Sequence, residues 1–185
     1  MSMATLGSLK KMQIISADAY NVGEIVDIRY DPENWNVIGI KAKTEKSAAK
    51  VMAAGSGRSL IQIKPRDYVI NDVMLMHEYL ADLRNIVEQD TDNFPTLSFM
   101  EDKKVSSSEG ITLGVIQSVN IDVSLWNVPS VSVRLDKSAY EALGLKKGLL
   151  SKTVIVIHTE YIQTASDVVT LNQNIGDLRN EIIIE

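Results

Sequence analysis

The sequence predicts a mainly β protein built from two small modules in tandem. The first observation is an internal repeat: each of the chain's two tryptophans follows a glycine by 12 residues, Trp35 after Gly23 and Trp126 after Gly114, and the two copies lie 91 residues apart. The second is that short runs rich in β-branched residues alternate with turn residues along both copies. Together they indicate two copies of one small sheet, joined by short loops.

The repeat extends through most of the 185 residues. Lys-Ser-Ala occurs at residues 46–48 and again at 137–139, and Asp-Leu-Arg-Asn occurs at residues 82–85 and again at 177–180. The small length change between these motifs falls where turns are expected, and loops tolerate insertions. Each copy is large enough to fold by itself. The predicted domains are residues 1–90 and residues 91–185.

Each copy begins with a predicted β-hairpin. Asp31 opens a turn that also contains Pro and Asn, residues that suit turn positions, and Gly23 and Gly114 indicate a bulge or a close backbone approach at a strand start. Short helical turns are predicted at residues 46–54 and 137–143. The predicted strands of the first copy are residues 24–30, 35–42, 60–64, 68–70 and 73–76. Those of the second are residues 115–122, 126–135, 153–158, 161–163 and 168–171.

These elements predict that each module is a strongly curved sheet of five to six short antiparallel strands. Such a sheet can bury its edges by closing into a small barrel. Asp72 and Asp167 are interpreted as tight-turn residues between the last strands of each copy.

Two segments differ from the strand pattern. Residues 78–88 have helical spacing of apolar side chains and predict a connecting helix. Three consecutive isoleucines, Ile182, Ile183 and Ile184, stand near the end of the chain. They could pair as a last strand, pack on the other module or pack on a second subunit; packing within the chain is favoured.

Composition restricts the functional class. The net charge of −5 disfavours direct nucleic-acid binding, which usually needs a basic surface. The chain has no cysteine, which fits a reducing cytoplasm, and no apolar stretch long enough for a transmembrane helix or a signal peptide. His77 and His158 do not occupy equivalent repeat positions and form no metal-ligand pattern. The glycine-rich residues 55–59 lack the pattern of a phosphate-binding loop. We therefore expect no enzyme, no metal and no cofactor.

Residues 105–116, Trp126 and Val128, and residues 154–171 resemble the PRC-barrel family, and the first copy matches through Gly23, Trp35 and the residues around them. The resemblance covers residues 9–76 and 100–171 and implies tandem PRC-type β-barrels. The Trp-x-Val form and the segment 143–145 are most similar to stand-alone archaeal PRC-barrel proteins. These are similar to cell-division adaptors that associate with a SepF-type membrane anchor.

The resemblance implies a non-catalytic, cytoplasmic adaptor that is recruited to the division site and binds a SepF-like anchor or another PRC-barrel protein. A ribosome-maturation or RNA-processing factor of the RimM type and a small-ligand carrier are the alternatives. We expect a homodimer, from the tandem design and the apolar tail. The predicted interaction surface consists of Tyr79, Leu83, Ile86, Val87, Ile182, Ile183 and Ile184.

Overall fold

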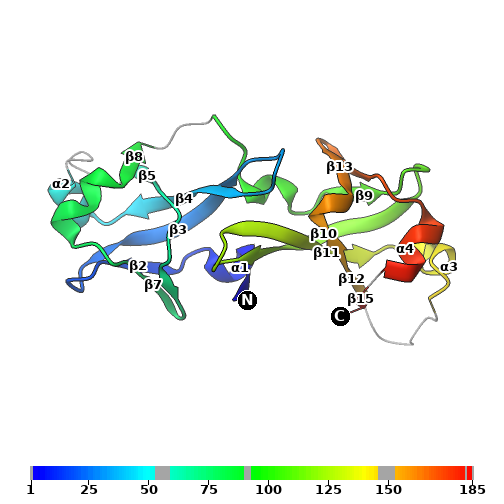
Figure 1. The fold of residues 1–185 in the computed structure, drawn as a ribbon, viewed down its shortest axis with the longest axis horizontal. Helices are drawn as coiled ribbons and strands as arrows, with labels where there is room; N and C mark the ends of the chain where they lie inside the picture. The colour runs from blue at the N-terminus through cyan, green and yellow to red at the C-terminus, as the bar shows by residue number, and fades with distance from the viewer. Residues whose placement is uncertain (1, 53–58, 90–92, 146–152, 182, 185) are drawn as a thin grey trace. The chain divides into compact units, whose positions relative to one another are not determined.

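The computed structural model describes residues 2–52, 59–89, 93–145, 153–181 and 183–184 (Figure 1). The protein is mainly β, with 45% strand and 21% helix, arranged in two mixed sheets. Its contacts divide it into two compact units, the first made of residues 1–98 with 122–127 and the second of residues 99–121 with 128–185. The sequence placed the boundary at residue 90 and did not assign residues 122–127 to the first unit.

The first unit contains one sheet with strand order β6-β7-β2-β3-β4-β5-β8 (Figure 1). Helix α2 lies at one end of this sheet, close to the 3₁₀ helix η1. The elements are β1 (Met3–Thr5), α1 (Leu6–Leu9), β2 (Gln13–Ile15), β3 (Asn21–Tyr30), β4 (Val37–Thr44), α2 (Lys46–Val51), β5 (Leu60–Ile63), β6 (Val69–Ile70), β7 (Val73–Leu75), η1 (Leu80–Asn85) and β8 (Val87–Gln89).

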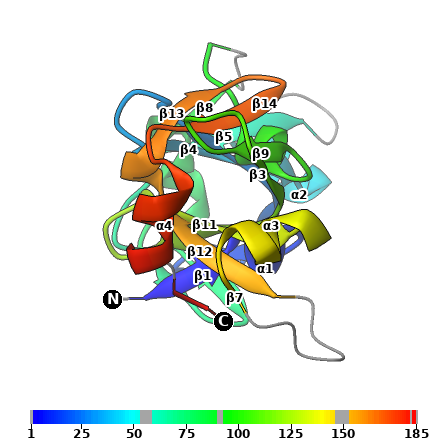
Figure 2. The same ribbon diagram turned by 90° about the vertical axis from the view of Figure 1, so that its right-hand side faces the viewer.

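The second unit has the corresponding strand order β13-β14-β9-β10-β11-β12-β15. Helices α3 and α4 lie beside each other (Figure 2), where the Arg179 guanidinium donates from Nε to the Ala142 carbonyl at 3.0 Å. The 3₁₀ helix η2 (Leu97–Met100) crosses the boundary between the units, and the remaining elements are β9 (Lys104–Ser106), β10 (Thr112–Asp122), β11 (Asn127–Leu135), α3 (Lys137–Ala142), β12 (Val154–His158), η3 (Thr159–Tyr161), β13 (Ile162–Ala165), β14 (Val168–Leu171), α4 (Ile175–Glu181) and β15 (Ile183–Ile184).

The sheets differ from the predicted antiparallel barrels. Strand β7 pairs parallel to β2, and β14 pairs parallel to β9, so both sheets are mixed. The first sheet has seven strands rather than five or six. Within the described residues neither sheet closes into a barrel. The parallel pairs were missed because local patterning predicts a strand but not the direction of the partner that it meets.

The two copies share unusual backbone conformations at equivalent positions. Non-glycine residues with positive φ include Lys11 and Asp102, at 68° and 62°, and Trp35 and Trp126, at 61° and 50°. Each of these pairs is 91 residues apart. A left-handed conformation is unfavourable for a bulky residue, so its recurrence at matching positions shows that both copies adopt the same unusual turns.

The two glycines that precede the long hairpins have the predicted role. The pairing register shifts between Ile14 and Ile15 opposite Gly23, and again between Thr112 and Gly114. A Cβ atom at Gly23 or Gly114 would collide with the backbone carbonyl of the neighbouring strand. The bulge and the close approach are therefore both confirmed.

The predicted connecting helix is wrong in type and extent. Within residues 78–88 the chain forms the 3₁₀ helix η1 over Leu80–Asn85 and then begins strand β8 at Val87, which pairs antiparallel with β5. The tail of the chain behaves similarly: β15 pairs antiparallel with β12. Each copy thus ends with a helix and an edge strand, and this pairing, within the chain, confirms the strand alternative for Ile183 and Ile184. Ile182 lies outside the described residues.

Among the residues that the structure describes, no helix combines the length and the apolar character that a membrane span requires.

Candidate functional site

The residues predicted as an interaction surface are divided between the core and the surface. Leu83 and Ile86 are 0% and 5% exposed and belong to the core of the first unit, so the prediction is wrong for them. Tyr79 is 60% exposed, and Val87 is half-buried on the edge strand β8.

The outer face of the first sheet carries a surface that the sequence did not reveal. Val69 on β6 pairs with Leu75 on β7, and Leu75 pairs with Ile15 on β2, so three apolar side chains form one row across three strands. Val69 is 44% exposed, Leu75 is 41% exposed and Ile15 is half-buried. Their neighbours Ile14 and Met74 point to the opposite face and are fully buried. We call Ile15, Leu75 and Val69 the apolar row.

The corresponding row of the second sheet has a different chemistry. Thr164 on β13 pairs with Thr170 on β14, Thr170 pairs with Ser106 on β9, and Ser106 pairs with Thr112 on β10. The hydroxyl oxygens of Thr164 and Thr170 are 2.6 Å apart and share a hydrogen bond. The two sheets therefore have the same strand order, with an apolar row on one and a hydroxyl row, Thr164, Thr170, Ser106 and Thr112, on the other.

Two exposed tyrosines stand at the end of the sheet that bears the apolar row. Tyr20 is 57% exposed and follows β2, and Tyr79 follows β7. Because β2 and β7 run parallel, their chains leave the sheet at the same end. The Ala17 amide donates to the Glu78 carbonyl at 2.9 Å, which keeps the two segments together there.

Asp18 holds this end of the sheet in place. Its Oδ1 accepts hydrogen bonds from the Ser16 hydroxyl at 2.7 Å and from the Leu80 amide at the start of η1 at 3.0 Å. The Ser16 bond lowers the pKa of Asp18 below its usual value, with the Leu80 amide acting in the same direction. In the second copy, Glu109 accepts in the same way from the Ile175 amide at 3.2 Å.

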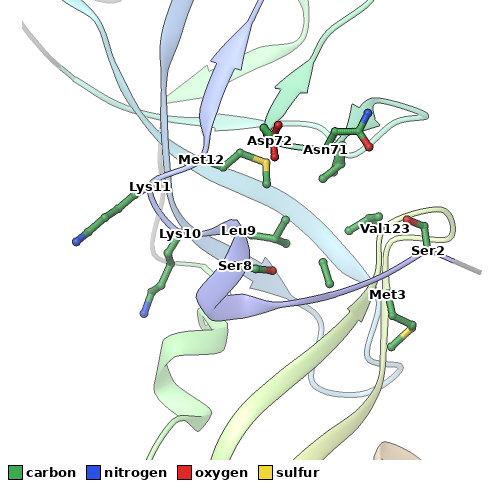
Figure 3. Close-up of a pocket in the computed structure, with 12 residues that line it drawn as sticks. Ser2, Met3, Ser8, Leu9, Lys10, Lys11, Met12, Asn71, Asp72 and Val123 are labelled. Atoms are coloured by element: carbon green, nitrogen blue, oxygen red, sulfur yellow. The ribbon is translucent and has the colours of Figure 1, made fainter.

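A cleft opens at the other end of the first sheet (Figure 3). Its volume is about 560 Å³, and it lies between the α1 region and the turn that joins β6 to β7. Leu9 and Met12 point into it, Asn71 and Asp72 stand on the far side, and Lys10 and Lys11 point away from it (Figure 3). The cleft has the size of a small-molecule site, but its walls mix apolar and polar groups without a set of converging charges.

The histidines are separate and each has a local role. His77 Nε2 lies 2.9 Å from the Asp67 carbonyl, and His158 packs edge-on against Tyr161 with ring centroids 6.2 Å apart. In the described part of the chain, no three His, Asp or Glu side chains are placed to hold a metal ion.

Burial raises the pKa of Tyr68, whose hydroxyl donates to the Lys64 carbonyl at 3.0 Å. Of the glycine-rich residues 55–59, only Ser59 is described; its amide donates to Thr44 Oγ1 at 2.9 Å.

The apolar row could have been predicted from the sequence only if the pairing of β6, β7 and β2 had been known. Val69, Ile15 and Leu75 occur in three separate short runs, and nothing local shows that these runs are neighbours. No protein-family model matches the chain, and no curated protein matches it.

Proposed function

We propose that this protein is a dimeric protein-binding adaptor in which two copies of one fold have acquired different surfaces. The observation that carries the proposal is the contrast between the apolar row of the first sheet and the hydroxyl row at the matching positions of the second. If both copies bound the same kind of partner, we would expect the same side-chain chemistry in the two rows. Exposed apolar side chains in a row are typical of surfaces that another protein covers.

The apolar row is the surface that we assign to dimerisation. When two copies of the chain meet across a two-fold axis, the apolar row of one copy contacts the apolar row of the other. Such a row can make this contact because apolar side chains are complementary to one another. The exposed Tyr20 and Tyr79 at one end of the row add the type of side chain that is enriched in interfaces.

The family and the cellular role follow from the resemblance described above. We propose that both modules belong to the PRC-barrel type, with sheets that are open in the described residues, and that the protein acts in cell division through a SepF-type membrane anchor. The repeated order of strands and the repeated bulges at Gly23 and Gly114 support a common origin of the two modules.

Light scattering after size exclusion tests the dimer. We expect a mass of twice 20.5 kDa for the natural chain. A variant carrying Ile15→Ser, Val69→Thr and Leu75→Thr, which transfers the chemistry of the hydroxyl row to the first sheet, should be a folded monomer. Leu60→Thr is the matched control, because Leu60 is 44% exposed on β5 outside the apolar row. A monomer for the natural chain, or a dimer for the triple variant, contradicts this assignment.

The adaptor role is tested by binding to a purified SepF-type protein. We expect a saturable complex, and crosslinking in cells should recover division proteins. Salt-sensitive co-sedimentation with small-subunit ribosome precursors, without such a complex, would support the ribosome-maturation alternative instead.

The cleft of Figure 3 supports the small-ligand alternative by its volume alone. A metabolite that raises the melting temperature of the natural chain, but not that of a Leu9→Phe or Met12→Trp variant with a filled cleft, would establish that role.

A further inference from the structure

We propose that the outer face of the second sheet binds an acidic helical segment of a partner protein. The surface is a second row of side chains beside the hydroxyl row, and this inference rests on the proposed adaptor function. On β9, Lys104 pairs with Val168 of β14 on one side and with Val115 of β10 on the other. Gly114, which precedes Val115 on β10, lies against the backbone of Arg134 and Leu135 on β11, and Arg134 pairs with Val154 of β12. We call Lys104, Val115, Val168, Arg134 and Val154 the basic row.

The two cations of the basic row are available to a ligand. Lys104 and Arg134 are exposed, and no ion pair holds either of them within the described residues. The neighbouring Lys103 is different, since its ammonium lies 3.7 Å from the centre of the Phe99 ring. Two unpaired cations on one sheet face contrast with the net charge of −5 of the whole chain, and such a local positive surface attracts negative partners.

The first unit shows that the fold does not require this charge. The strand pairing puts Gln13 at the position of Lys104, Glu24 at that of Val115 and Lys43 at that of Arg134. Glu24 and Lys43 are opposite each other on β3 and β4, so their charges offset one another. The basic row is therefore a property that the second copy has gained or that the first has lost.

The chemistry of the face indicates what it would bind. Val115 lies between the two cations, Val168 and Val154 flank them, and all three valines are half-buried and offer apolar contact. The adjacent hydroxyl row adds Ser106 and Thr170, whose hydroxyls can donate to carboxylate oxygens. A ligand with carboxylates at its edges and apolar groups between them matches this arrangement.

Spacing favours a helix over an extended segment. Lys104 and Arg134 stand on β9 and β11, with β10 between them, so two strand spacings separate them, about 9.6 Å. Residues i and i+7 of a helix lie on one face and are about 10.5 Å apart along its axis. Glutamates at i and i+7 can therefore meet both cations, while apolar residues at i+3 and i+4 contact Val115.

A designed peptide tests the inference with the full-length protein. The probe is a fluorescently labelled alanine-based helix with Glu at i and i+7 and Leu at i+3 and i+4, and binding is followed by fluorescence anisotropy. We expect saturable binding that weakens with added salt. The double variant Lys104→Gln with Arg134→Gln should weaken it by about tenfold, as expected for two exposed ion pairs. Lys43→Gln with Lys46→Gln removes the same charge from the first unit and should leave binding unchanged.

Four results would overturn the inference. They are no binding at about 1 mM peptide, equal binding by the Lys104/Arg134 variant, equal binding of a peptide with Gln in place of Glu, and preferential binding of a single-stranded RNA that depends on the same two cations. Light scattering of the same samples separates the two proposals. A dimer that does not bind the peptide refutes only the acidic partner, whereas a monomer that binds it refutes only the dimer.

Discussion

At the scale of single residues, the chain is organised by backbone geometry that recurs in both copies. Trp35 and Trp126 close their hairpin turns with positive φ, although tryptophan is unfavourable there. The turns are stabilised by equivalent aspartates: Asp31 Oδ1 accepts from the Glu33 amide and Asp122 Oδ1 accepts from the Ser124 amide, both at 2.9 Å. Side-chain bonds of this kind make such turns favourable.

Replacing Gly114 by Ala should destabilise the protein by about 1–3 kcal/mol or more, because the added methyl group meets the Arg134 carbonyl of the adjacent strand. Chemical denaturation measures the loss. Gly7→Ala is the control: among the described residues outside its own helix backbone and its chain neighbours, the nearest heavy atom to its added Cβ is Thr5 Oγ1 at 4.0 Å, so the change should be neutral or stabilising by about 0.5–1 kcal/mol. An equal effect of both substitutions would contradict the close approach.

The hydrogen bonds of Asp18 make a pH-dependent contribution to stability. Its pKa is lowered in the folded protein from the usual 3.8, so the contribution is present above that value and is lost as the pH falls through the lower folded pKa. In Asp18→Asn this acid-dependent part should disappear. Unfolding curves measured from pH 6 down to about pH 2.5 would show it; the same slope in both proteins would exclude Asp18 as its source.

At the scale of elements, the segment after β8 is fastened to strand β3. Asp27 and Arg29 are 8% and 3% exposed on one face of β3. Asp27 Oδ1 accepts from the Ser98 amide at 3.2 Å, and the Arg29 guanidinium donates to the Phe94 carbonyl. The Tyr30 amide donates to the Pro95 carbonyl at 3.2 Å. Residues 94–98 are thereby a part of the first unit, which explains why its boundary lies beyond residue 90.

Asp27→Ala should therefore destabilise the first unit by about 1–3 kcal/mol, because the buried Ile28 amide and the half-buried Ser98 amide lose their acceptor. Hydrogen exchange should be faster at Ser98 than in the natural chain. Ser118 occupies the equivalent position of the second copy, and Ser118→Ala should change stability by no more than about 0.5 kcal/mol. Unchanged exchange at Ser98 would contradict the fastening role.

At the scale of the whole molecule, the two compact units are not two consecutive stretches of chain. Residues 122–127 belong to the first unit. Within that unit Trp126 is 6% exposed, its carbonyl accepts from the Val37 amide at 2.7 Å and its indole Nε1 donates to the Arg66 carbonyl. The first unit therefore includes a tryptophan that lies 28 residues beyond Ser98 in the sequence.

Trp126→Ala should cost about 3–5 kcal/mol, as for other buried aromatic residues, and should increase hydrogen exchange at Val37. Leu125→Ala is the control, because Leu125 is 68% exposed. Because residues 122–127 belong to the first unit, a fragment of residues 1–98 should be less stable than the first unit of the full chain. A fragment that unfolds at the same denaturant concentration would refute this contribution.

The sequence by itself determined the duplication, most strands, the short helices α2 and α3 and the role of Gly23 and Gly114. These features depend on local turn chemistry, on β-rich runs and on similarity between the copies, all of which are readable along the chain. It also predicted that residues 183–184 could pair as a strand. It did not determine that residues 78–88 divide into η1 and β8, because an amphipathic spacing over so few residues fits several elements.

Only the tertiary structure decided which residues form the surfaces. Leu83 and Ile86, predicted to belong to the interaction surface, are buried, whereas the apolar row and the basic row each combine residues from three or more strands. The parallel pairings of β7 with β2 and of β14 with β9 place these residues side by side. Register and strand direction are set by contacts between segments that are distant in the sequence. The sequence therefore does not show which residues on other strands lie beside a given apolar or basic residue.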